Sequence, residues 1–497
     1  MRAALHNLGC KVNAYELDII QQKLEEKGYE IVSFDSEADI YIVNTCTVTN
    51  IADRKSRQML HQARKRNPAA VVVAVGCYVQ TGTEQVLQDA GVDLVIGNHK
   101  KGQAAELIEA FLAGRTAAEN SKNPEKDSDP QKENLEALAA AKTLGGDSLT
   151  DIGRVYEYEE MTLQKTAEHT RAYIKIQDGC NQFCSYCIIP YARGRVRSRH
   201  YEDILKEVRG LVAAGYQEIV LTGIHISSYG IDFEDDAWEK GECVNRLKSD
   251  ERHDYSGAGK LIDMLERLAK ESGIRRIRLG SLEPRIITED TAKRLAAISQ
   301  LCPHFHLSLQ SGCDATLRRM NRHYTAAEYA QSVAELRRAF DHPAITTDVI
   351  VGFPQETEEE FAETVRFLED LALYEMHIFK YSARKGTVAA GMKGQLTEAV
   401  KGERSDVLLS MTARHSAEYR RAWIGRRAEV LFEEEKEVDG RSYWVGHTGE
   451  YVKAALMSGE NLENRLLTCE ITGMLTDEIV ECRCAEGADT ENGTISA

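Results

Sequence analysis

Short apolar runs alternate with amphipathic stretches along the N-terminal part of the chain. The apolar runs at residues 3–8, 40–43 and 71–75 have the length of buried strands. The stretches at residues 13–27 and 52–66 have the 3.6-residue period of helices. Strands that alternate with helices indicate a parallel sheet covered on both faces. We therefore predict a doubly wound α/β domain over residues 1–115.

A second alternating region begins near residue 172. Its six strand candidates, most of them separated by helical stretches, are residues 173–176, 218–221, 277–279, 304–309, 346–351 and 376–381. Six such units predict a partial (βα)6 barrel over residues 166–420, with its functional site at the C-terminal ends of the strands. The short alternating runs and glycine-containing turns that follow predict a small β-barrel over residues 421–485.

Three polar segments interrupt this pattern. Residues 116–165 are acidic and predict a linker or insertion, with a short alanine-rich helix near residues 135–141. Residues 232–260 are charged and poorly periodic, which indicates a surface insertion. Residues 486–497 are predicted to be a disordered tail.

Composition narrows the class of protein. The 497 residues carry a formal net charge of −17, which argues against binding nucleic acid through overall positive charge. The N-terminus has no apolar signal core, and the longest apolar run, residues 69–75, is too short to cross a bilayer. We therefore expect a cytoplasmic protein. Twelve cysteines in a reducing compartment indicate metal or redox chemistry rather than disulfides.

The strongest cysteine signal is a Cys-x3-Cys-x2-Cys run on the loop after the first barrel strand. It consists of Cys180, Cys184 and Cys187. Thiolate ligation suits zinc or an iron-sulfur cluster, but no further Cys or His pair follows at the spacing of a zinc finger. Three protein ligands would leave one iron of a cluster open for a small molecule. A structural zinc knuckle is the alternative.

Three further cysteines, Cys10, Cys46 and Cys77, each follow one of the three N-terminal strands. Isolated cysteines are often buried as small hydrophobic residues. The C-terminal ends of parallel strands, however, meet at one edge of a doubly wound sheet. We therefore expect a second site with three thiolate ligands.

The Cys-x3-Cys-x2-Cys run, with Tyr186 before its last cysteine, resembles the signature of the radical S-adenosylmethionine superfamily. The residues around the N-terminal cysteines resemble those of its methylthiotransferase family. This resemblance extends over nearly the whole chain, including residues 191–195, 307–312 and 347–354 and a C-terminal barrel similar to a TRAM domain.

The resemblance implies an enzyme that attaches a methylthio group to C2 of a modified adenosine in tRNA. It implies two 4Fe-4S clusters, one held by Cys180, Cys184 and Cys187, which cleaves S-adenosylmethionine, and one held by Cys10, Cys46 and Cys77, which donates sulfur. It also implies an external electron donor of the flavodoxin or ferredoxin type. At strand ends, the candidate S-adenosylmethionine contacts are Tyr186, Gly223, Glu283, Gln310 and Ser311.

Basic segments follow two of the cysteine sites and predict contacts to the anticodon loop of tRNA. One segment contains Arg57 and Lys65, and the other has four arginines at alternating positions, Arg193, Arg195, Arg197 and Arg199. A weaker group is formed by Arg318, Arg319 and Arg322.

Three branches of the family act on different substrates. Lys11-Val12-Asn13 after the first cysteine, with residues 47–49 and 52–57, resembles the branch that acts on N6-threonylcarbamoyladenosine. The branches that act on N6-isopentenyladenosine and on an aspartate of a ribosomal protein remain alternatives. A non-catalytic iron-sulfur protein that binds RNA is an alternative of another class.

Overall fold

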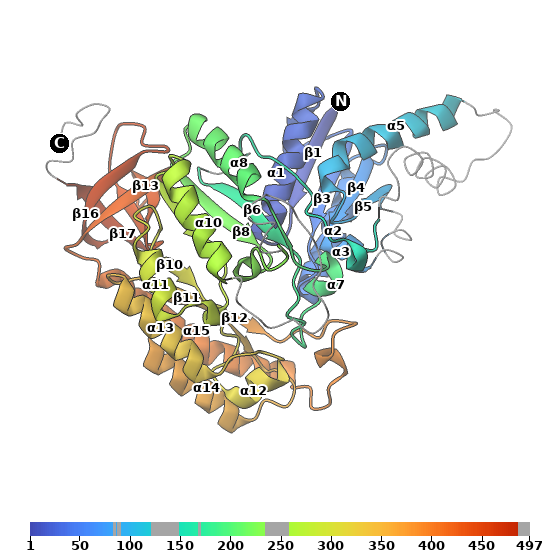
Figure 1. Ribbon diagram of the computed structural model, residues 1–497. Helices are drawn as coiled ribbons and strands as arrows, with labels where there is room; N and C mark the ends of the chain where they lie inside the picture. The colour runs from blue at the N-terminus through green and yellow to red at the C-terminus, as the bar shows by residue number, and fades with distance from the viewer. Residues whose placement is uncertain (83–85, 87–90, 121–148, 167–169, 234–257, 486–497) are drawn as a thin grey trace.

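The computed structural model describes residues 1–82, 86, 91–120, 149–166, 170–233 and 258–485. The predicted insertion at residues 232–260 and the predicted tail at residues 486–497 lie almost wholly outside these ranges, as does the predicted helix near residues 135–141. The described part of the chain forms three domains (Figure 1). None of the helices in this part is both long and apolar enough to cross a membrane.

The N-terminal domain is a sheet of five parallel strands in the order β2-β1-β3-β4-β5. These strands are β1 (Arg2–Asn7), β2 (Glu30–Val32), β3 (Ile40–Thr45), β4 (Val71–Gly76) and β5 (Leu94–Ile96). Helices α1 (Lys11–Glu26) and α5 (Ala104–Asn120) pack on one face, and α2 (Asn50–Arg66) and α3 (Cys77–Thr81) on the other. The predicted doubly wound domain is confirmed, because apolar side chains of the strands are buried on both faces.

The central domain contains the six predicted parallel strands, divided between two sheets. One sheet has the order β7-β6-β8-β9 and the other β10-β11-β12. The strands are β6 (Ala172–Asp178), the short antiparallel β7 (Arg197–Ser198), β8 (Glu218–Gly223), β9 (Arg276–Leu279), β10 (His304–His306), β11 (Ala344–Val351) and β12 (Glu375–Lys380). Isolated bridges from β9 and from Leu282 to residues beside β10 join the sheets. Strand β10 ends at His306 and is therefore shorter than the predicted strand at residues 304–309.

The helices of the central domain itself cover the outer face of this partial barrel. They include α8 (Tyr201–Ala213), α10 (Ala258–Glu271), α11 (Glu289–Ala296), α13 (Ala326–Ala339) and α14 (Glu358–Leu371). Alternate strand residues, such as Ile219, Ile277 and Val349, form one apolar core with these helices. The other strand residues face inward, and many of them are polar, such as Lys175 and Asp348. This interior differs from the packed apolar interior of a complete (βα)8 barrel.

Helix α1 of the N-terminal domain lies against the inner face of β6 and β8, between the two domains (Figure 1). Tyr15 and Ile19 of this helix pack with Tyr173 of β6. Met161 and Leu163 complete the same cluster. The prediction of a linker over residues 116–165 is therefore wrong at its C-terminal end, because residues 149–165 return to the domain junction and bury apolar side chains there.

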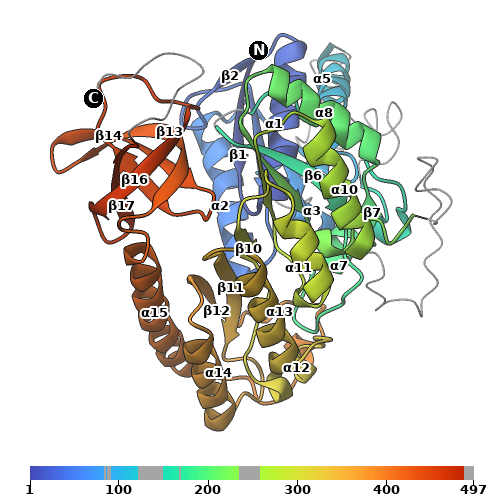
Figure 2. The same cartoon turned by 60° about the vertical axis from the view of Figure 1, so that its left-hand side comes forward.

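The C-terminal domain is a closed barrel of five strands, as predicted, in the order β13-β14-β15-β17-β16. Its strands are β13 (Arg427–Val438), β14 (Arg441–Thr448), β15 (Lys453–Leu456), β16 (Leu466–Met474) and β17 (Ile479–Cys484). Helix α15 (Glu398–Arg421) connects it to the three-stranded sheet (Figure 2).

A loop of the C-terminal barrel reaches the N-terminal end of the central barrel strands. Tyr451 stacks on His304 of β10 with ring centroids 4.9 Å apart, and the guanidinium of Arg278 in β9 lies 4.8 Å from the same tyrosine ring. Arg278 also donates to the backbone oxygen of Gly449 at 2.8 Å. The third domain therefore closes this end of the central barrel.

Candidate functional site

Cys180, Cys184 and Cys187 lie on the loop after β6, at the C-terminal edge of the four-stranded sheet. The loop begins at Gly179 with a φ of 72°, where an added Cβ would lie 1.7 Å from the backbone oxygen of Arg195. Only glycine fits this position. The N–H of Cys187 donates to the oxygen of Cys184 at 2.9 Å, which forms a tight turn between two of the cysteines.

Two side chains from later loops, Arg322 and Glu283, support this loop. The Arg322 guanidinium donates to the Sγ of Cys184 at 3.3 Å and to the Oε2 of Glu283 at 3.0 Å. Burial alone would raise the pKa of Glu283, but Arg322 and then His225 hold that pKa at about 2. Glu283 is therefore an anion that fixes Arg322 against the sulfur, as outer groups commonly do around metal ligands.

Cys10, Cys46 and Cys77 directly follow β1, β3 and β4, apart from a short turn before Cys10. The turn before Cys10 lies close to Cys46, because a Cβ added at Gly9 would lie 3.2 Å from the Sγ of Cys46. The side-chain amide of Asn98 donates to the Sγ of Cys77 at 3.5 Å. The predicted placement of three thiols at one sheet edge is confirmed.

The chemistry of both thiol groups fits iron-sulfur clusters. Burial, followed by the neighbouring Cys184, raises the pKa of Cys187 to about 12, and burial is the main cause that raises the pKa of Cys46 to about 11. A buried thiol with a raised pKa still loses its proton when its sulfur binds a metal ion, because the metal ion takes the place of the proton. Among the residues that the structure describes, only a different group, His306, Asp348 and His377, brings three ligand atoms within 4.8 Å of one another. In each three-thiol group at least two of the sulfurs are therefore more than 4.8 Å apart, whereas the sulfurs of a tetrahedral zinc site are roughly 3.8 Å apart.

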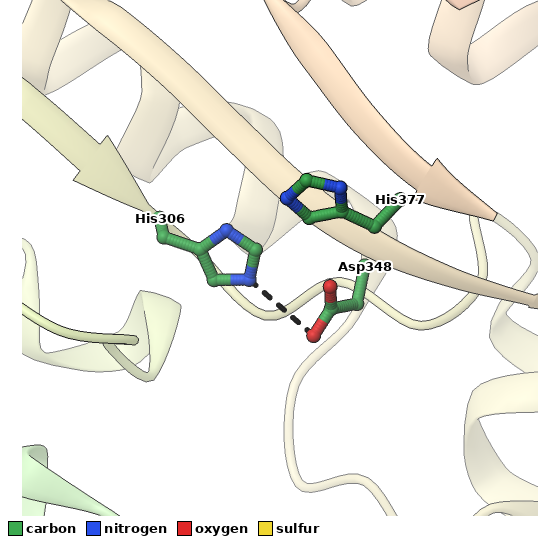
Figure 3. A group of neighbouring side chains, drawn as sticks. All are labelled: His306, Asp348 and His377. Carbon is green, nitrogen blue, oxygen red and sulfur yellow. Dashed lines mark ion pairs between the residues drawn. The ribbon is translucent and has the colours of Figure 1, made fainter. Parts of the chain in front are cut away.

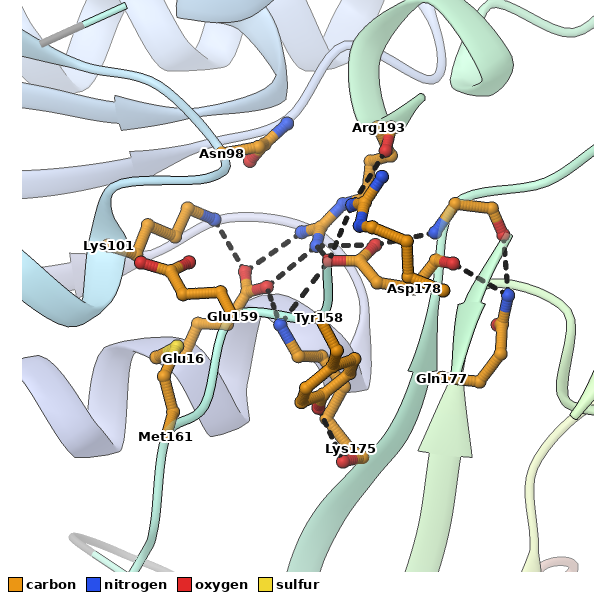
Figure 4. Close-up of polar contacts among 12 residues, drawn as sticks. Glu16, Asn98, Lys101, Tyr158, Glu159, Met161, Lys175, Gln177, Asp178 and Arg193 are labelled. Carbon is orange, nitrogen blue, oxygen red and sulfur yellow. Dashed lines mark hydrogen bonds and ion pairs between the residues drawn. The ribbon is translucent and has the colours of Figure 1, made fainter. Parts of the chain in front are cut away.

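A buried ionic cluster joins the two cysteine sites (Figure 4). Its central residue is Glu16 of α1, which accepts hydrogen bonds from Lys101 at 2.5 Å, Lys175 at 2.9 Å and Arg193 at 2.7 Å. Asp178, at the end of β6, lies 3.3 Å from Lys175 and 3.2 Å from Arg193. Since Glu16 follows Cys10 in the same helix and Asp178 precedes Cys180, this cluster fixes the two sites relative to each other.

The ionic cluster has a surplus of positive charge. Burial would raise the pKa of Asp178, but Arg193, Lys175 and Arg197 hold it at about 2. Asp178 and Glu16 are therefore charged and face three buried cations, and Arg197 approaches Asp178 at 3.6 Å as a fourth. A third carboxylate, Glu159, lies beside them, and burial raises its pKa to about 7, so the four cations still outnumber the carboxylates. Negatively charged thiolate-bound iron on either side would balance this surplus, which supports the cluster assignment.

Four of the five candidate S-adenosylmethionine contacts lie near C-terminal strand ends, and the fifth, Tyr186, lies on the cysteine loop and packs against Phe353. Gly223 ends β8, and Glu283, Gln310 and Ser311 follow β9 and β10. Gln310 has a φ of 73°, an uncommon conformation for a residue with a side chain, and is fixed because its N–H donates to the oxygen of Asp348 at 2.8 Å. The Ser311 hydroxyl is buried and contacts Thr364 at 3.3 Å.

The structure corrects the prediction of RNA contacts for three of the four alternating arginines. Arg193, Arg197 and Arg199 have exposed fractions of 0%, 2% and 0%. Arg199 binds Glu207 and Glu160 within the domain junction. These three cations are therefore not available to phosphate groups, whereas Arg195 is exposed, with its guanidinium 4.6 Å from the Phe183 ring.

The second basic segment is on the surface. Arg57 and Lys65 of α2 are exposed, and with Arg54 and His61 they line a shallow hollow of about 460 Å³. In the weaker third group, Arg322 is instead used at Cys184, and Arg319 binds Glu360. The sequence did not reveal these partners, because they are distant along the chain.

Comparisons with known proteins agree with this geometry. The Radical SAM superfamily matches residues 174–368, and the Uncharacterized protein family UPF0004 matches residues 2–97. The threonylcarbamoyladenosine tRNA methylthiotransferase MtaB of Bacillus subtilis (strain 168) is 36% identical, with 99% of both chains covered. The MtaB protein of Aquifex aeolicus (strain VF5) is 36% identical over 89% of this chain and 95% of its own.

A relative whose name refers to another substrate is somewhat less similar. The tRNA-2-methylthio-N(6)-dimethylallyladenosine synthase of Methylacidiphilum infernorum (isolate V4) is 33% identical over 88% of this chain and 85% of its own. With two three-thiol sites and near full-length similarity to these enzymes, the chain belongs to the radical S-adenosylmethionine methylthiotransferase family, on the MtaB branch.

Proposed function

We propose that this protein converts N6-threonylcarbamoyladenosine in tRNA into its 2-methylthio derivative. The observation that carries this proposal is the pair of three-thiol sites, held in one arrangement by the buried cluster around Glu16 and Arg193. The similarity to MtaB proteins over 99% of the chain supports the choice of substrate.

Membership in the radical S-adenosylmethionine superfamily implies S-adenosylmethionine and a 4Fe-4S cluster. When bound to Cys180, Cys184 and Cys187, the cluster supplies the electron and the open iron for S-adenosylmethionine cleavage, a chemistry that can replace hydrogen on an unactivated aromatic carbon. Cys10, Cys46 and Cys77 would hold the second cluster, which would supply the sulfur for the transfer.

The surrounding side chains have positioning roles. Arg322 holds its N–H against the Cys184 sulfur, and Glu283 keeps Arg322 in this orientation. Asn98 donates to the Cys77 sulfur and to the backbone oxygen of Ala192 at 2.8 Å, so it connects the N-terminal site to the segment after Cys187. Such outer hydrogen bonds orient ligands and tune a metal site.

S-adenosylmethionine is proposed to lie across the ends of the central strands, where Tyr186, Gly223, Glu283, Gln310 and Ser311 are placed. Glycine at position 223 lets the ends of β6 and β8 lie close together, because an added Cβ would lie 2.9 Å from the backbone oxygen of Gln177. For RNA, we propose phosphate contacts by Arg57, Lys65 and Arg195, whose side chains are exposed.

Reducing equivalents are proposed to come from an external donor of the flavodoxin or ferredoxin type. The second candidate function is methylthiolation of N6-isopentenyladenosine. The relative at 33% identity whose name refers to dimethylallyladenosine favours keeping it as an alternative.

Mass spectrometry of tRNA nucleosides tests the proposal. A strain that lacks this protein should lose 2-methylthio-N6-threonylcarbamoyladenosine and regain it when the gene is restored. Loss of the isopentenyl analogue instead would retain the chemistry and change the substrate. If both nucleosides persist in the deletion strain, the proposed function is wrong.

A further inference from the structure

Two histidines and an aspartate gather on the inner face of the three-stranded sheet, outside both cysteine sites (Figure 3). His306 ends β10, Asp348 lies in β11 and His377 lies in β12. The register pairs Asp348 directly with His377. The rings of His306 and His377 are stacked with centroids 5.7 Å apart. Because the three residues lie on adjacent strands, their geometry is rigid.

Hydrogen bonds orient this group and leave it open to solvent. The Nε2 of His306 lies 3.3 Å from the Oδ2 of Asp348, and its Nδ1 lies 3.0 Å from the hydroxyl of Thr346. The side chain of His306 is 14% exposed and that of Asp348 30%, while His377 is exposed. A carboxylate accepts several hydrogen bonds, so Asp348 retains capacity for a ligand, and His377 can donate to one.

The group lies one layer of side chains below the proposed reaction site. Ile350, two residues beyond Asp348, packs with the same small apolar cluster as Tyr186 of the cysteine loop. Two residues along a strand correspond to about 7 Å. C2 and the N6 nitrogen lie on the same edge of the adenine ring. When C2 faces the cysteine loop, a substituent on N6 extends away from that loop by a distance similar to the one between Ile350 and Asp348.

Three ligand atoms this close could also bind a metal ion, but the neighbouring charges favour an anionic organic group. Burial, and then the cations Arg278 and Lys11, lower the pKa of His304, which faces inward two residues before His306. Arg278 is paired with Glu218 at 2.8 Å. Glu375, which faces inward two residues before His377, lies 3.7 Å from Arg420. Burial, and then Arg278 and Arg171, lower the pKa of Lys11 to about 8, so Lys11 is still mostly charged at neutral pH. Lys11 makes no ion pair with any residue in the described ranges, and its charge attracts an anion rather than a divalent cation.

We propose that His306, Asp348 and His377 form the site that recognises the threonylcarbamoyl substituent of the substrate. This inference rests on the proposed function. His377 donates to the carboxylate of the substituent, Asp348 accepts from its N–H or hydroxyl groups, and His306 holds Asp348 in place. An isopentenyl substituent offers none of these groups and would leave the site's polar atoms without partners, which is a strong basis for rejection.

Binding measurements test this assignment without turnover. The holoprotein, kept anaerobic and without reductant, is titrated into three fluorescent anticodon stem-loops that differ only in the target nucleoside: threonylcarbamoyladenosine, isopentenyladenosine or adenosine. The wild type should bind the first at least about tenfold more tightly than the others, as expected for one or two specific hydrogen bonds to charged groups. Asp348→Asn and His377→Ala should each remove most of this preference and leave binding of the adenosine hairpin unchanged.

The control is Asp370→Asn, which changes an exposed carboxylate in α14 and should keep the full preference. Iron content and thermal melting of each variant establish that it is folded and loaded, and His377 is exposed enough for its replacement to be tolerated. Equal binding of all three hairpins by the wild type, or an undiminished preference in both variants, would overturn the inference.

Elemental analysis separates the metal alternative. A stoichiometric transition metal other than iron that is lost in Asp348→Asn would also overturn the inference. The proposed function is judged separately by the nucleosides of the deletion strain. If the 2-methylthio nucleoside is lost there but the purified protein shows no preference among hairpins, only the assignment of this site is wrong.

Discussion

Glu16 and Arg193 form a two-pronged ion pair, with nitrogen-oxygen distances of 2.7 and 2.9 Å, although 177 positions separate them in the chain. Glu16 belongs to the helix after Cys10, and Arg193 to the short helix α7 (Ile189–Arg193) after Cys187. Both side chains are fully buried. The pair therefore sets the spacing and orientation of the two cysteine sites.

Removal of either partner should strongly destabilise the protein. We expect Glu16→Gln and Arg193→Met each to cost about 3–5 kcal/mol in the free energy of unfolding, because each leaves buried charge without compensation. The double variant should cost less than the sum. Urea titrations of the loaded protein measure these values, and Glu109→Gln, which removes an exposed ion pair with Lys27, should have little effect on stability. Additive single effects would contradict the coupling.

Glu218 should make stability depend on pH in the acid range. Burial would raise its pKa, but Arg278 and Arg276 hold it at about 2, below the usual 4.5. Its stabilising contribution, on the order of 3 kcal/mol, is complete above pH 4.5 and is lost as the pH falls towards 2. The stability difference between wild type and Glu218→Gln should thus shrink from pH 6 to pH 3 in denaturant titrations. A constant difference over this range would show that Glu218 does not titrate as stated.

Single cysteine replacements should separate the two thiol sites. Cys184→Ala should abolish reductant-dependent release of 5′-deoxyadenosine, since it removes a ligand of the cleaving cluster. Cys46→Ala should retain this release and lose methylthiolation. Chromatography of the small-molecule product and mass spectrometry of the RNA measure both reactions. Cys484→Ala, in an exposed position of the C-terminal barrel, is the control. Continued release in Cys184→Ala would refute the assignment.

The surface of α2 should contribute to RNA affinity. Arg57→Glu and Lys65→Glu should each weaken binding of an anticodon stem-loop and reduce the slope of log affinity against log salt concentration by roughly one, as expected for the loss of a phosphate contact. Fluorescence anisotropy at several salt concentrations measures the slope. Arg421→Glu, an equal change of charge at the exposed end of α15, should leave it unaltered. A slope that changes equally in all three variants would indicate only a general effect of net charge.

Much of this architecture could be predicted because it follows from patterns of apolar residues and cysteines over short stretches of the sequence. The strands before Cys10, Cys46 and Cys77 are short apolar runs, and parallel topology then brings the three thiols to one edge. In the same way, the spacing of Cys180, Cys184 and Cys187 is a local property of one loop.

Features that depend on distant partners could not be predicted in this way. The arginines at positions 193, 197 and 199 look like an exposed basic surface, and only the fold brings Glu16, Asp178 and Glu207 to them. The group of His306, Asp348 and His377 comes from three separate strands, and each strand contributes one residue. In neither case does the spacing of residues along a short stretch of the sequence indicate which partners the fold brings together.

The stacking of Tyr451 on His304 has a consequence for how the central domain can be studied. Together with the hydrogen bond from Arg278 to Gly449, this stacking lets the C-terminal barrel close the central barrel at the end opposite the cysteine loop. A chain truncated after α15 would expose the buried charges of Arg276, Arg278 and Glu218 to water. The third domain is therefore needed for the stability of the central domain as well as for any contact with RNA.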